Sequence, residues 1–188
     1  MLQQVSLSDQ LSQPGSSYRK YMEALTVMFC DQQLNLDELL QLTTHQHNRT
    51  AFHAGWLLEC LILKHSEKFA DHIPTIIYYG AIITNQSCQR HFAKVYSALT
   101  DRKAPIEVRT ALQNIDLEPI VEQCFDRLID PKTKVAVKVF AAETLCNLSG
   151  RYDWIAEELI VQLQYLMQNG SPAIQSAGRR LLNSLRRR

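Results

Sequence analysis

Acidic side chains recur at helical spacing in the second half of this chain. In the first of two segments they stand four residues apart, which places them along one face of a helix. A row of carboxylates favours a basic partner, and a tyrosine beside it is a suitable anchor. A solvated polar face explains the same pattern without any partner. The predicted binding residues are Glu118, Glu122, Asp126, Glu157, Glu158 and Tyr165.

Histidines are the second group that could do chemistry. Five of the six lie within 28 residues, at His45, His47, His53, His65 and His72. A metal site needs three or four converging ligands, and this spacing does not bring them onto one helical face. Cys88 and His91 lie one helical turn apart and could supply two ligands, but no second pair has matching spacing. We therefore expect no metal site and no cofactor.

Catalytic signatures are absent from the sequence. There is no Gly-x-Ser-x-Gly motif and no glycine-rich phosphate loop, and the whole chain has six glycines. Aromatic side chains such as Trp56 and Trp154 could line a groove, although aromatics at helical spacing more often belong to a core. The sequence favours a protein that is not an enzyme.

The cysteines and the apolar runs indicate the compartment. The five cysteines are odd in number and unclustered, which argues against a disulfide framework and favours reduced, buried thiols. No secretory signal is recognisable at the N-terminus, and the longest apolar run is far shorter than the roughly 20 residues of a membrane span. We expect a cytoplasmic protein that does not enter a membrane.

Charge is divided unevenly along the chain. The formal net charge is +1, yet five arginines lie in the last ten residues, and the remainder carries 15 basic and 19 acidic residues, a net of −4. An acidic body with a basic tip does not provide the broad basic surface that phosphate backbones require. Nucleic acid is therefore an unfavoured partner.

These residues lie on helices that repeat. Four segments share a small or aromatic residue followed by large apolar residues four and seven positions later, and the last positions, 61, 99, 148 and 185, are separated by 38, 49 and 37 residues. Such a period indicates a helical solenoid, in which each hairpin buries its apolar face against the next. The segment 101–112 accounts for the longer second interval.

Caps and prolines divide the chain into hairpins. We predict a flexible N-terminal arm over residues 1–17, in which Val5–Leu11 could form a short turn, and one helical repeat domain over residues 18–188. Four residues are predicted N-caps: Asn85, Asp116, Asp130 and Ser171, and the last three each have a proline soon after them. The predicted hairpins pair 18–30 with 36–44, 49–65 with 73–84, 87–99 with 116–129, and 132–148 with 153–168, and a last helix covers 171–187.

The segments Phe52–Leu61 and Val137–Leu148 resemble HEAT-repeat proteins, and the chain from about Arg49 to Leu185 is similar to a set of short bacterial HEAT-like proteins. The matching features are Trp56, Pro74, Arg90 and the segment Lys138–Ala141. The resemblance implies an all-α, right-handed α-α superhelix of about four helical hairpins plus a C-terminal helix. It also implies a scaffold or adaptor role without a cofactor, with the second helices lining the concave side.

The predicted function is a non-enzymatic scaffold that binds a protein or peptide, such as a basic segment, on the second-helix face. The alternative is a nucleic-acid-associated relative of the HEAT-like DNA alkylation-repair glycosylases, for which the pair Asp153-Trp154 is suggestive. Glu157 and Glu158 flank that pair, and an acidic groove opposes DNA binding. Self-assembly through exposed repeat ends is a third hypothesis, so the oligomeric state stays open.

Overall fold

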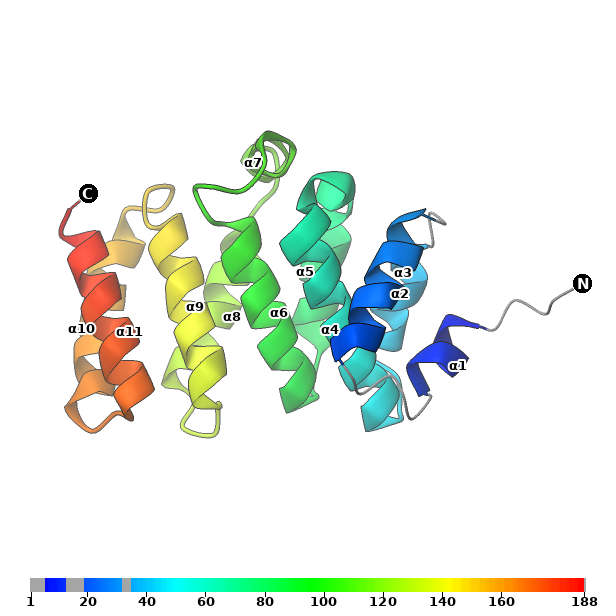
Figure 1. Ribbon diagram of the computed structural model, residues 1–188. Coiled ribbons are helices and arrows are strands. Elements are labelled where there is room, and N and C mark those ends of the chain that lie inside the picture. Colours follow the sequence, from blue (N-terminus) through cyan, green and yellow to red (C-terminus); the bar gives the residue numbers. More distant parts are fainter. Residues whose placement is uncertain (1–5, 13–18, 32–34, 188) are drawn as a thin grey trace, which may run out of the picture. The chain divides into compact units, whose positions relative to one another are not determined.

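The computed structural model describes residues 6–12, 19–31 and 35–187, and the regular structure within these ranges is helical throughout (Figure 1). The all-α prediction is therefore confirmed. The chain divides into two compact units, residues 1–95 and 96–188. The extent of the repeat domain, 18–188, stays a prediction.

The first unit contains six helices in its described part, the last of which continues past the boundary. They are α1 (Leu7–Ser12), α2 (Arg19–Asp31), α3 (Leu36–Leu42), α4 (Asn48–His65), α5 (Ile73–Ile82) and α6 (Gln86–Leu99), with the 3₁₀ segment η2 (Ser66–His72) between α4 and α5. Helices α1, α2 and α3 pack on α4, and α3 also packs on α5.

The second unit is also built from helices that pack around one central helix. Its helices are α7 (Ile106–Gln113), α8 (Glu118–Ile129), α9 (Val135–Leu148), α10 (Trp154–Gln168) and α11 (Pro172–Leu185). Helix α9 packs on α8, α10 and α11, and α10 packs on α11. Figure 1 shows α9 and α11 side by side in one layer, with α8 and α10 in a second layer behind them.

The repeating apolar positions form the core of both units. Leu61, Leu99, Leu148 and Leu185 are all buried. The residues that precede them by three and seven positions are buried too, except Leu182, which is half-buried. The repeat pattern predicted from the sequence is therefore the pattern of burial, because each apolar stripe faces a neighbouring helix.

Two of the predicted helix caps are confirmed by hydrogen bonds. Asn85 Oδ1 accepts from the backbone N–H of Ser87 at 2.9 Å, and Ser171 Oγ accepts from that of Ile174 at 3.5 Å. The helix predicted to open at Asp130 was placed too early, since α9 begins at Val135. Asp130 instead accepts from the Lys132 N–H at 2.9 Å, which closes a turn ahead of the helix.

The predicted flexible arm, residues 1–17, requires a correction for residues 7–12. These residues form α1, which buries Leu7 and Leu11. The Nδ1–H of His53 on α4 donates to the Leu11 carbonyl at 2.7 Å and ties α1 to that helix. The abundance of Gln and Ser obscured the two leucines four residues apart. Residues 1–5 and 13–17 of the predicted arm lie outside the described residues.

The insertion at 101–112 contains a helix of its own. Helix α7 buries Val108 and Leu112. Arg151, in the turn between α9 and α10, donates to the carbonyls of Leu112 and Ile115 at 2.6 and 2.7 Å. These carbonyls lie at the C-terminal end of α7, where a cation is favourable. The extra residues are therefore anchored within the second unit.

Candidate functional site

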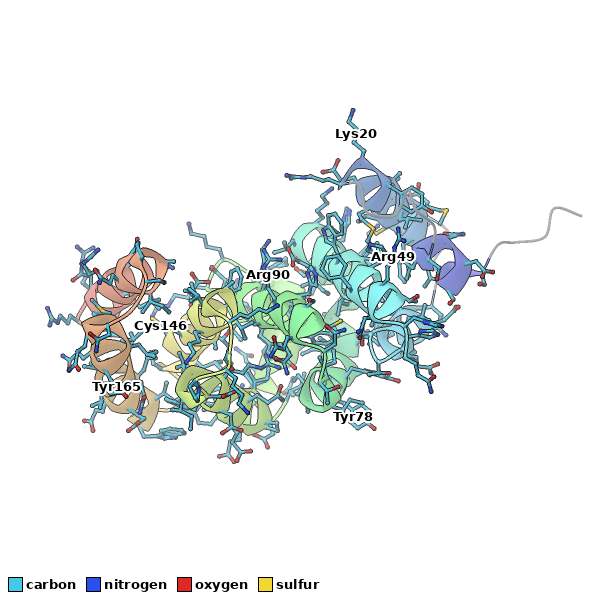
Figure 2. The ribbon with its side chains drawn as sticks, turned by 90° about the horizontal axis from the view of Figure 1, so that it is seen from below. Lys20, Arg49, Tyr78, Arg90, Cys146 and Tyr165 are labelled. Atoms are coloured by element: carbon cyan, nitrogen blue, oxygen red, sulfur yellow. The ribbon has the colours of Figure 1, made fainter. Side chains whose placement is uncertain are left out.

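The predicted acidic residues lie on the exposed faces of α8 and α10, both in the second unit. Helix α8 buries Ile120, Val121, Cys124 and Leu128, and α10 buries Ile155, Leu159 and Leu163. The opposite sides of these two helices are exposed and carry every predicted binding residue: Glu118, Glu122, Asp126, Glu157, Glu158 and Tyr165. Figure 2 shows Tyr165 at the edge of α10, on the side away from α11.

An aromatic contact joins the two helices. The rings of Phe125 on α8 and Trp154 on α10 stack with centroids 5.5 Å apart. Trp154, Val161 and Tyr165 are exposed at positions that share one side of α10. We call these three residues, with Glu118, Glu122, Asp126, Glu157 and Glu158, the acidic aromatic surface.

The carboxylates of this surface are available for a partner. Among the described residues, none of the five carboxylates lies within 4.0 Å of a Lys, Arg or His side-chain nitrogen. Glu158 accepts a hydrogen bond from Gln162 at 2.8 Å, a neutral contact along the same helix. The structure thus brings the predicted residues onto one side of two adjacent helices and leaves their negative charge uncompensated by neighbouring cations.

A second polar group lies in the first unit and was not predicted. Glu59 on α4 is buried and accepts from two residues of α6: the Nδ1–H of His91 at 2.6 Å and Nζ of Lys94 at 2.6 Å. We call these three residues the Glu59 cluster. Burial by itself raises the pKa of Glu59, but the hydrogen bonds and charges of His91 and Lys94 outweigh it and hold that pKa below its ordinary value.

A pocket of about 400 Å³ opens beside the Glu59 cluster. Phe52 and Trp56 of α4 form its aromatic wall, and their ring centroids lie 6.0 Å apart. Arg90 of α6, labelled in Figure 2, is exposed and also lines the pocket. A larger cavity of about 660 Å³ lies near Cys30 and His72.

One signal in the sequence points to the Glu59 cluster. Glu59 interrupts an apolar run from Leu57 to Leu63 in which the only other non-aliphatic residue is Cys60. A charged residue on the buried side of a helix requires a partner. The partners lie 32 and 35 residues later, so they become evident only when neighbouring repeats are stacked.

The histidine-rich stretch does not form a metal site in the described part of the chain. No group of three or more His, Cys, Asp or Glu side chains there is arranged to hold a metal ion. The rings of His45 and His47 stack on each other with centroids 5.4 Å apart, and His53 is buried against α1. Burial lowers the pKa of His53, which favours its neutral form.

None of the five cysteines, all of which lie in the described residues, forms a disulfide, and Cys88, Cys124 and Cys146 are buried. Burial raises the pKa of Cys88 and that of Cys124 to about 12 each, so neither supplies a thiolate nucleophile near neutral pH. None of the described helices is long and apolar enough to cross a membrane.

Comparison with known proteins gives one family. The model of the HEAT repeat domain matches residues 7–185. Neither a curated protein nor a solved structure matches the chain significantly. The match spans nearly the whole sequence and includes both units. This chain belongs to the HEAT-repeat family.

Proposed function

We propose that this protein is a non-enzymatic scaffold that binds a basic protein segment on the acidic aromatic surface of α8 and α10. The observation that carries the proposal is the exposure of Trp154, Val161 and Tyr165 on one side of α10, flanked by carboxylates without ion-pair partners among the described residues. Helical repeat scaffolds commonly present extended binding surfaces of this kind.

The aromatic residues supply the main source of affinity. Tryptophan and tyrosine are enriched among the residues that dominate interface energetics, because they bury a large area at a small entropic cost. The stacking of Trp154 on Phe125 restricts its orientation before a partner arrives. A partner with apolar side chains therefore meets a partly ordered surface.

The carboxylates select the charge of the partner. Glu122 and Asp126 on α8 and Glu158 on α10 present negative charge beside the aromatic groups. Opposite charges steer association, and like charges suppress incorrect partners. A segment that combines lysine or arginine with apolar residues fits both features, whereas an acidic segment does not.

Site-specific photo-crosslinking tests this proposal in the native cell. A benzophenone amino acid at Val161, which is 58% exposed, lies within the acidic aromatic surface; the matched control is Tyr78 in the first unit, which is 60% exposed. We expect Val161 adducts to contain basic peptides of a partner and Tyr78 adducts to lack them. Equal adducts from both positions would contradict the proposal.

Charge reversal then tests the role of the carboxylates with the purified partner. Glu122→Lys with Asp126→Lys should weaken binding by about tenfold or more, because favourable contacts become repulsive. The control pair, Asp31→Lys with Glu107→Lys, makes the same change in net charge at exposed positions outside the surface. Equal affinities for the two double variants would remove the carboxylates from the binding site.

A second candidate function is nucleic-acid binding by the arginines of the C-terminal end. The observation that favours it is a shallow cavity in the second unit lined by Arg102, Arg180 and Arg187. Phosphate contacts make such binding strongly salt-dependent. A gel-shift titration with duplex and single-stranded DNA across salt concentrations tests it, and the absence of a shift at low salt would exclude it.

A further inference from the structure

The pocket beside the Glu59 cluster has an excess of positive charge. Its lining contains four cations and two carboxylates: Arg19, Lys64, Arg90, Lys94, Glu23 and Glu59. Arg19 pairs with Glu23 at 3.1 Å, and Lys94 pairs with Glu59 at 2.6 Å. Lys64 and Arg90 have no ion-pair partner among the described residues. The pocket therefore offers two uncompensated cations to an anion.

The same pocket offers flat apolar surface. Trp56 and Phe52 are half-buried in its wall, and the ring of His91 lies 5.1 Å from that of Phe52. Aromatic side chains stack on flat, unsaturated groups with offset or tilted geometry. An anion that also carries a ring would contact both the cations and the aromatic wall.

One residue of the pocket wall, His91, is almost completely buried. His91 is 2% exposed and lines the pocket, and its Nε2 has no hydrogen-bond partner in the structure. The ionised Glu59 carboxylate can only accept, so Nδ1 carries the proton of that hydrogen bond. Nε2 itself is inaccessible to solvent, so His91 contributes its ring, and not this nitrogen, to the wall that a ligand would contact.

We infer that this pocket binds a small organic anion that carries a flat ring. Its phosphate or carboxylate lies beside Arg90 and Lys64, and its ring lies against Trp56. Nucleoside monophosphates and aromatic carboxylates share this chemistry. The volume of about 400 Å³ is within the range of small-molecule sites. The site lies entirely in the first unit, so the inference does not depend on the surface of α8 and α10.

The two tryptophans allow a direct measurement. Trp56 lines the pocket and Trp154 lies on α10, so Trp154→Phe leaves Trp56 as the only tryptophan reporter. The probes are AMP and naphthalene-2-carboxylate, each compared with an uncharged counterpart, adenosine or naphthalene-2-carboxamide. We expect a saturable change in Trp56 emission with at least one anion, and binding of its uncharged counterpart weaker by about tenfold or more. The anion that binds more tightly shows whether the pocket prefers a nucleoside phosphate or an aromatic carboxylate.

A charge-reversal pair tests the placement of the anion. Arg90→Glu should weaken binding by about tenfold or more, since an attractive contact becomes repulsive. Lys20→Glu is the matched control, because Lys20 is exposed in the same unit and does not line the pocket. Both residues are exposed, and circular dichroism verifies that both variants keep their helices.

Three results would overturn the inference. The first is the absence of saturation by either anion up to about 1 mM, the limit of weak specific binding. The second is equal affinity for the charged and uncharged probes or equal affinity of the Arg90→Glu and Lys20→Glu variants. The third is salt-dependent binding of a single-stranded oligonucleotide that Arg90→Glu weakens and Lys20→Glu does not, in a protein that binds neither small anion, which would assign the pocket to nucleic acid instead.

Discussion

Residues at the same position of the repeat form ion pairs of different burial in the two units. Trp56, Lys94, Glu143 and Arg180 each precede the matching leucine of their repeat by five residues. In the first unit, Lys94 of this row pairs with Glu59, whose side chain is only 8% exposed. In the second unit, Glu143 pairs with Arg180, and these side chains are 20% and 60% exposed.

This difference in exposure determines what each ion pair contributes. A buried carboxylate loses its hydration and becomes dependent on its partners, so removal of one partner leaves an uncompensated charge. An exposed pair retains much of its hydration and is screened by salt. The Glu59 cluster is therefore an internal constraint on α4 and α6, whereas the Glu143 pair is a weak surface contact.

The largest effect is expected from Glu59→Ala. It removes the acceptor of His91 and Lys94 and leaves both without their carboxylate partner. We expect the free energy of unfolding to fall by about 3 kcal/mol, the lower end of the values for broken buried pairs, because Lys94 is partly exposed. Urea unfolding followed by circular dichroism measures it. If Glu59→Ala lowered the free energy of unfolding as little as Glu143→Ala does, the buried pair would contribute no more than the exposed one.

Arg151→Ala should have an intermediate effect, confined to the second unit. The guanidinium makes charge-assisted hydrogen bonds to the carbonyls of Leu112 and Ile115, and their loss should cost about 2 kcal/mol. Amide hydrogen exchange should accelerate most in α7. Arg109→Ala provides the control, because Arg109 is an exposed arginine of α7 itself. Unchanged exchange in α7 would show that other contacts hold it.

The pH dependence of stability provides a further test of the Glu59 cluster. The pKa of Glu59 is lower in the folded protein than its ordinary value of 4.5. Its stabilising contribution is therefore fully present above pH 4.5 and is lost as the pH falls through the lower, folded pKa. Thermal melts between neutral and acidic pH should show a smaller loss of stability for Glu59→Gln than for the unchanged protein. Parallel pH profiles would contradict this assignment.

Glu143→Ala should have the smallest effect, a loss of less than about 1 kcal/mol, since exposed pairs contribute little. It removes the acceptor of Ser97 at 3.0 Å and of Arg180. Urea unfolding at low and high salt measures the effect, and the small loss should shrink further when salt screens the charges. A loss comparable to that of Glu59→Ala would show that this pair is stronger than its exposure indicates.

Much of the fold could be predicted because its signals are local. The segment Val135–Val139 alternates as a strand would, yet the helical period that continues to Leu148 identified it correctly as helix. Asn85 and Ser171 were recognisable caps because a cap involves only neighbouring residues. The missed helix α1 is short, and its stability depends on contacts with α4 that a local pattern does not reveal.

The candidate sites also contain features that local spacing predicted and features that depend on packing between repeats. Glu118, Glu122 and Asp126 were placed on one helical face from their spacing alone, and the structure places them there. The contact of Phe125 on the same helix with Trp154 depends on the packing of α8 beside the following repeat, and only the structure shows it. Whether a partner binds there stays a prediction.

The sequence by itself determined the helices, the repeat period and the apolar stripes, because each depends on residues within a few positions of one another. Only the tertiary structure decided which charges are buried and which are free. Glu59 accepts hydrogen bonds from His91 and Lys94, which lie 32 and 35 residues later in the sequence. A local periodicity does not predict contacts over such a separation. The physical reason is that the cost of a buried charge depends on its neighbours in space, and stacking of the repeats supplies those neighbours.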